Sequence, residues 1–164
     1  MVNPKSCAMK YRVTKLLNLF KITSFAAVII LSTQCSKYHG ETEKYALNSP
    51  GMGLQVVPAT ASNATAEMIG DYSAGGNALS GTITWTGLSG APTAIHFHGP
   101  AAPGRNNIYQ FQLVKVPAVS SGSMIFQSIF TEAQEESLIK GYYYYDIHTA
   151  AFPNGEIRGQ ILLQ

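Results

Sequence analysis

Cysteine and charged residues are both scarce in this sequence. Its 164 residues include two cysteines, Cys7 and Cys35, and only 12% of the residues are charged. Residues 1–34 contain five basic and no acidic residues, whereas residues 35–164 contain six basic and nine acidic residues. The body of the chain is therefore mildly acidic and lacks a basic cluster, so nucleic acid is not an expected partner.

The basic N-terminal segment leads into a short apolar run at residues 22–31. Basic residues followed by about ten apolar ones are typical of a secretion signal, whereas a membrane-spanning helix needs about 20. The sequence therefore predicts that residues 1–34 are a signal peptide, with Met9 as a possible true start.

Cys35 follows the apolar run, where a bacterial lipoprotein carries its lipidated cysteine. The segment 31–35 resembles the loose lipobox of Bacteroidetes-type lipoproteins, and removal of Cys7 with the leader would leave Cys35 alone. This favours lipidation over plain signal cleavage and excludes an intrachain disulfide. We expect a cell-envelope protein, periplasmic or on the outer-membrane surface, whose only membrane contact is the lipid. The polar residues 35–55 are expected to form a flexible tether.

Short alternating segments separated by turn residues begin at residue 56. In the segment 78–86, Ile83 and Trp85 share one face and threonines share the other, as the period of two in a strand requires. The pattern predicts strands at 65–72, 78–86, 93–98, 108–114, 123–130, 142–148 and 156–163, and a capped helix at 131–141. Residues 56–164 are thus expected to form one all-β domain, an antiparallel Greek-key or immunoglobulin-like sandwich or barrel of about seven to eight strands.

Three of the four histidines lie at the ends of predicted strands, next to Gly- and Pro-rich loops. His96 and His98 share one strand face in "AIHFHGPA", and His148 shares the polar face of "YYYYDIHTA" with Asp146. Two histidines at i and i+2 can bind one ion, and a third imidazole from a neighbouring strand completes a set suited to copper or zinc. Polar side chains that could orient these imidazoles are Asp146, Glu156 and Arg158.

Two other interpretations of the histidines stay open. They could form structural hydrogen bonds to turn carbonyls, or they could contact an organic or protein ligand. No catalytic residues are expected, because the sequence has no Gly-x-Ser-x-Gly motif and no free cysteine would remain as a nucleophile. His39 lies in the predicted tether and is expected to be solvated.

The histidine segments resemble the CHRD domain, first described in chordin and widespread in bacterial exported proteins. The shared motifs are His-x-His-Gly-Pro-Ala at 96–101 and Tyr-x-x-x-His-Thr-Ala-x-x-Pro-x-Gly-Glu-Ile-Arg-Gly-Gln at 144–160, and "LQVVPA" at 54–59 resembles the family's first strand. The resemblance covers about residues 54–164 and implies an immunoglobulin-like or Greek-key β fold.

Together these observations predict an exported CHRD-domain lipoprotein that binds a transition metal, copper before zinc, through His96, His98 and His148. The main alternative is a non-catalytic adhesion or interaction module at the cell surface, with structural histidines and a protein or glycan partner that the sequence does not identify. A third hypothesis is an oxidoreductase at a copper centre, which needs an open coordination position that the sequence does not show.

Overall fold

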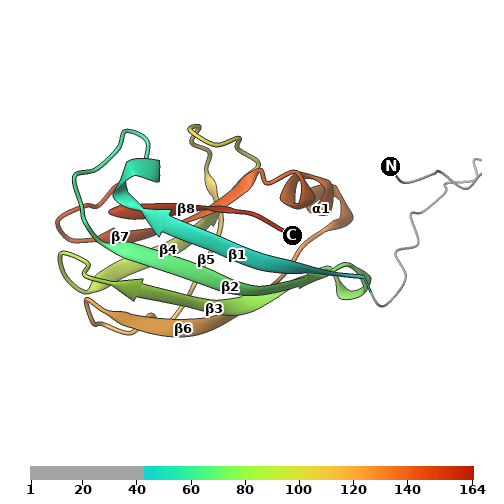
Figure 1. Ribbon diagram of the computed structural model, residues 1–164, viewed down its shortest axis with the longest axis horizontal. Helices are drawn as coiled ribbons and strands as arrows, with labels where there is room; N and C mark the ends of the chain where they lie inside the picture. Colours follow the sequence, from blue (N-terminus) through green and yellow to red (C-terminus); the bar gives the residue numbers. More distant parts are fainter. Residues whose placement is uncertain (1–42) are drawn as a thin grey trace, which may run out of the picture. The chain divides into compact units, whose positions relative to one another are not determined.

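The computed structural model describes residues 43–164, which contain eight strands and one α-helix (Figure 1). The predicted signal peptide, Cys35 and the first part of the predicted tether lie outside the described residues. The elements are β1 (Lys44–Met52), β2 (Thr65–Ser73), β3 (Ala78–Thr86), β4 (Pro92–His98), β5 (Tyr109–Gln112), β6 (Gly122–Ile129), α1 (Glu132–Ile139), β7 (Tyr143–Thr149) and β8 (Ile157–Ile161).

All eight strands belong to one antiparallel sheet in the order β5-β4-β7-β8-β1-β2-β3-β6. The sheet curls, so that the half with β4 and β7 faces the half with β3 and β6 across a shared core (Figure 1). Phe97 on β4 and Phe126 on β6 lie near opposite edges of the sheet, yet their ring centroids are 5.3 Å apart. The predicted all-β class is thus confirmed, and the predicted sandwich or barrel takes the form of one curled sheet.

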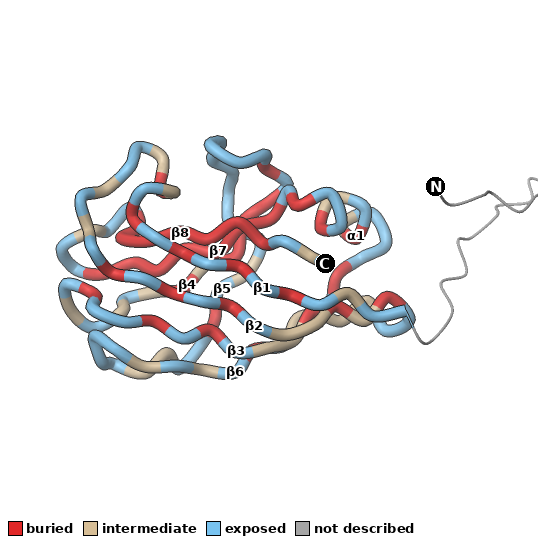
Figure 2. Tube along the Cα trace, viewed as in Figure 1, coloured by how far each residue is buried: buried red, intermediate tan, exposed pale blue. Residues whose placement is uncertain are grey.

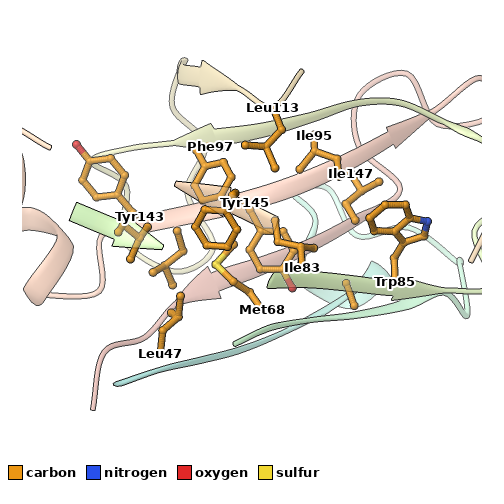
Figure 3. Close-up of a cluster of buried hydrophobic side chains, with 14 of the residues drawn as sticks. Leu47, Met68, Ile83, Trp85, Ile95, Phe97, Leu113, Tyr143, Tyr145 and Ile147 are labelled. Atoms are coloured by element: carbon orange, nitrogen blue, oxygen red, sulfur yellow. The ribbon is translucent and has the colours of Figure 1, made fainter. Parts of the chain in front are cut away.

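The core follows the alternation of the strands. On β3, Leu79, Ile83 and Trp85 are buried, whereas Thr82 and Thr84 are exposed. The same alternation of buried and exposed residues is visible along β1, β2 and β3 in Figure 2. Figure 3 shows the central cluster, to which several strands contribute large apolar side chains. Each such side chain stabilises the fold by about 1.5–3 kcal/mol through burial.

The structure corrects the expected tether, because its residues 44–52 form β1. This strand pairs with β2 along its whole length. Its inward-facing residues include Leu47, Ser49 and Gly51, so the apolar alternation that would reveal a strand is missing. Small residues are required because the Tyr145 side chain fills the space. A Cβ on Gly51 would lie 2.6 Å from the Tyr145 hydroxyl.

The segment after β1 also differs from expectation. Residues 54–59, which resemble the first strand of the CHRD family, form part of a 3-10 turn (Gly53–Gln55) and a loop. The other predicted strands and the helix agree with the structure to within a few residues.

The helix α1 has the predicted capping box. Thr131 accepts a hydrogen bond from the Gln134 backbone, and the Gln134 side chain accepts one from the Thr131 backbone. Gly141 follows the helix with a φ of 72°, a left-handed conformation that favours glycine. Within residues 43–164, no helix has the length and apolar character needed to cross a membrane.

The hairpin of β7 and β8 is buried on both faces. Its inner face packs on the core. Its outer face carries Glu156, Arg158 and Gln160, as predicted, but loops cover these polar side chains. Gln160 donates to the carbonyl of Ala101, and Arg158 donates to the side chain of Asn106. The outer side of β4, β7 and β8 is therefore a second, polar interior.

Candidate metal centre

Four side chains meet on the outer face of β4 and β7. His96 and His98 share this face of β4, Asp146 and His148 share the face of β7, and His96 is paired directly with Asp146 in the antiparallel register. One possible ligand atom of each side chain lies within 4.8 Å of the other three. The convergence of the three predicted histidines is therefore observed, with a carboxylate among them.

Each of the three histidines of the cluster has one ring nitrogen within hydrogen-bond distance of an oxygen outside the cluster. Nδ1 of His98 is 2.8 Å from the carbonyl oxygen of Asn107, and Nδ1 of His148 is 2.9 Å from that of Pro153. Carbonyl oxygens only accept, so both Nδ1 atoms carry a proton and donate it. Nε2 of His96 is 3.3 Å from Oε1 of Gln112, which is also an acceptor.

The opposite ring nitrogens face Asp146. Nε2 of His148 lies 2.8 Å from Oδ1 of Asp146, and Nε2 of His98 lies 3.1 Å from Oδ2. Nδ1 of His96 is 4.0 Å from Oδ1. In a neutral imidazole each of these nitrogens carries a lone pair, which cannot bond to a carboxylate. The arrangement therefore needs either protons on the rings or a cation between the four groups.

Two of these distances suit a single metal ion, whereas the 4.0 Å from Nδ1 of His96 to Oδ1 of Asp146 is longer. Two ligand atoms about 2.0–2.1 Å from one ion are about 2.9–3.4 Å apart at ordinary coordination angles. The Asp146 contacts to His98 and His148 lie close to this range. Histidines that bind a metal usually donate the N–H of their other ring nitrogen to a backbone carbonyl or a carboxylate, as His98 and His148 do here.

The electrostatics of the cluster favour a charged carboxylate. Burial alone raises the pKa of Asp146, but hydrogen bonds from His148 and His98 outweigh it and the pKa is lowered. Burial lowers the pKa of His148, but the hydrogen bond and charge of Asp146 outweigh it and that pKa is raised. Burial and repulsion from His148 lower the pKa of His96. At neutral pH His96 is therefore a neutral imidazole with a lone pair available.

Aromatic rings hold two of the imidazoles in place. Tyr109 stacks on His96 with 4.7 Å between the ring centroids, and Tyr144 stacks on His98 at 4.6 Å. The Arg158 guanidinium lies 3.5 Å from the centroid of the Tyr144 ring. These contacts restrict ring rotation and so prearrange the nitrogens for a ligand.

Comparison with known proteins assigns the chain to a family. The family model of the CHRD domain matches residues 47–161, which is more than half of the chain. The chain belongs to the CHRD domain family. No match was found among curated proteins or among solved structures. The matched region of the CHRD domain begins within β1, in agreement with the place of this strand in the sheet.

The structure gives the three predicted orienting residues of this CHRD domain different places. Asp146 touches the histidines directly and is itself a possible ligand. Arg158 stacks on Tyr144 and lies opposite Asp146 in the register of β7 and β8, but it forms no hydrogen bond to the described histidines. Glu156, expected to hold an imidazole N–H, instead accepts hydrogen bonds from Ser62, Ser89 and Thr149 and from none of the described histidines.

Most of the groups that orient the rings leave no signal in the sequence. The carbonyls of Asn107 and Pro153 come from loops, and a backbone acceptor leaves no mark in the identity of its residue. Tyr144 was detectable, because strand alternation places it on the same face as Asp146 and His148. The pairing of β5 with β4, which brings Tyr109 to His96, has no local signal.

Proposed function

We propose that this CHRD domain binds one transition-metal ion, copper before zinc, through His96, His98 and His148, with Asp146 as the anionic member of the site. The observation that carries the proposal is the orientation of the rings. In each of the three histidines one ring nitrogen is held by an acceptor outside the cluster, so the other faces Asp146 and, once deprotonated, has a lone pair for an ion.

The donor set supports the preference for copper. Imidazole nitrogens bind copper and zinc well, and at a given site of nitrogen and oxygen donors Cu²⁺ binds more tightly than Zn²⁺. Asp146 lowers the cost of burying a divalent cation because it supplies a negative charge at the site. The role proposed is binding rather than catalysis, in a protein that is exported and attached to the cell envelope by a lipid on Cys35.

The test is a calorimetric titration of the purified protein with Cu²⁺ and, separately, Zn²⁺. We expect one ion per chain with a Kd of about 1 μM or lower for copper and weaker binding of zinc. His148→Ala should weaken copper binding by at least about a hundredfold, since it removes a ligand. His39→Ala removes the fourth histidine, which lies outside the described residues, and is the matched control that should leave affinity unchanged.

Two results would contradict the proposal. One is no copper or zinc binding at micromolar concentrations, in which case the cluster is a structural lock of protonated histidines around Asp146 and the domain is an interaction module. The other is copper binding that His148→Ala leaves unchanged.

A further inference from the structure

A buried arginine that forms no ion pair within 4.0 Å with a described residue lies next to the candidate metal centre, opposite Asp146 in the register of β7 and β8. Arg158 is 2% exposed. Its two side-chain hydrogen bonds go to neutral amide oxygens, those of Asn106 at 3.2 Å and Gln160 at 3.1 Å. Among the described residues, no carboxylate forms an ion pair with it. Burial of this guanidinium is unfavourable, and the stack on Tyr144 and the charge of Asp146 offset the loss of water only in part.

A pocket of about 230 Å³ connects this guanidinium with the histidines. Arg158, Tyr144 and Asp146 are buried residues of its wall, whereas Asn106 and Asn154 are exposed. A ligand entering between the two asparagine-bearing loops would therefore reach Arg158 and the cluster. The volume equals that of about seven or eight water molecules, so the ligand must be small.

We propose that this pocket binds a small carboxylate whose charge pairs with Arg158. A planar guanidinium matches the two oxygens of a carboxylate, and two of its five N–H donors serve Asn106 and Gln160. Val56, Val57 and Pro153 also line the pocket and can contact a short apolar group on the ligand. One negative charge on the ligand pairs with Arg158, and a second one would be repelled by Asp146, so the pocket favours a monoanion over a dianion.

The pocket and the metal centre share Asp146, His98 and His148. A divalent ion there would neutralise Asp146 and so strengthen carboxylate binding. Linkage requires that the carboxylate strengthen metal binding by the same factor. Pairing with Arg158 needs no metal; only this coupling rests on the proposed function.

The test is a titration of the protein with sodium acetate, followed by ¹H–¹⁵N NMR, once without metal and once with one equivalent of Zn²⁺. We expect saturable shifts at millimolar acetate and none with acetamide, its neutral analogue. Zinc should raise acetate affinity at least about fivefold. Arg158→Gln should lower acetate affinity at least tenfold, and Arg158→Lys should lie between the two.

Val57→Phe is a second variant that narrows the pocket and leaves Arg158 in place, for the case that Arg158→Gln does not fold. It should lower acetate affinity as well. The proposal is overturned if the folded wild type shows no saturable acetate binding in either state, or if acetate binding is insensitive to the Arg158 and Val57 substitutions. Zinc titration without acetate reports separately on the metal centre, so acetate binding to the metal-free protein decides this proposal even where zinc does not bind.

Discussion

Glu156→Gln is expected to destabilise the domain strongly without affecting copper binding. The Glu156 carboxylate is 1% exposed and accepts four hydrogen bonds, two on Oε1 from Ser62 Oγ and the Ser89 backbone, and two on Oε2 from Ser89 Oγ and Thr149 Oγ1. The bonds from Ser62 and Ser89 tie the β7–β8 hairpin to the loops that precede β2 and β4. Glutamine keeps one acceptor oxygen but turns an NH₂ toward the two hydroxyls.

The size of the loss follows from these contacts. A hydrogen bond to a charged group contributes about 1.5–3 kcal/mol. The substitution removes the charge from four bonds and reverses the donor role in two, and the hydroxyls can rotate in partial compensation. We expect a decrease of about 2–4 kcal/mol in the free energy of unfolding at pH 7. Glu67→Gln makes the same change at an exposed position of β2 and should alter stability by less than about 0.5 kcal/mol.

The pH dependence gives a second readout. Burial alone raises the pKa of Glu156, but the hydrogen bonds from Ser89, Thr149 and Ser62 lower it below its usual 4.5. A carboxyl with a lowered folded pKa contributes stability above its unfolded pKa, and this contribution is lost as the pH falls through the folded value. The difference between wild type and Glu156→Gln should therefore be constant from pH 8 to about pH 5.5 and shrink below about pH 4.

Urea unfolding of wild type, Glu156→Gln and Glu67→Gln at several pH values measures these effects. The reasoning is refuted if Glu156→Gln is as stable as Glu67→Gln at pH 7, or if the difference does not change with pH. A large decrease in copper affinity in a folded Glu156→Gln protein would place Glu156 in the metal site and contradict the assignment made from its contacts.

Three further predictions concern the surroundings of the site. Gly99→Ala should lower stability by about 1–3 kcal/mol in urea unfolding, because its Cβ would lie 2.7 Å from the Tyr143 ring, whereas Gly90→Ala, with no atom within 4 Å, should cost less. Tyr144→Leu should weaken copper binding about three- to tenfold in calorimetry by removing the stack on His98, and Tyr144→Phe, which keeps it, should not. Because the pKa of His148 is raised, the protonated His148–Asp146 pair stabilises the metal-free protein below the pKa of His148 in the unfolded chain, and this stability is lost as the pH rises through its pKa in the folded protein. Copper must displace the proton from His148, so copper affinity, measured by calorimetry, should increase from pH 6 to pH 8. Equal copper affinities at the two pH values would contradict this assignment of the proton.

The strands with apolar alternation were predictable, and β1 shows why the rest was not. Its inward positions hold Ser49 and Gly51 because Tyr145 comes from another strand to fill the core there. A pattern read along one segment cannot detect a side chain supplied by another. The same limit applies to Glu156, whose donors Ser62 and Ser89 come from distant loops.

The candidate site was predictable in its histidines but not in its inner structure. Spacing alone places His96 and His98 on one face, and the polar alternation of β7 adds Asp146 and His148. The central position of Asp146 depends on the register that pairs it with His96. A shift of two residues would keep the apolar residues on the inner face but place Asp146 opposite another residue, and strand alternation alone does not distinguish these two registers.

The most direct test of the central claim is X-ray absorption spectroscopy of the protein loaded with one equivalent of copper, which counts the imidazole rings bound to the ion. The structure predicts three imidazoles, with one fewer in each of His96→Ala, His98→Ala and His148→Ala. A wild-type spectrum with no imidazole scattering, or variant spectra that all match that of the wild type, would contradict a metal centre built from these histidines.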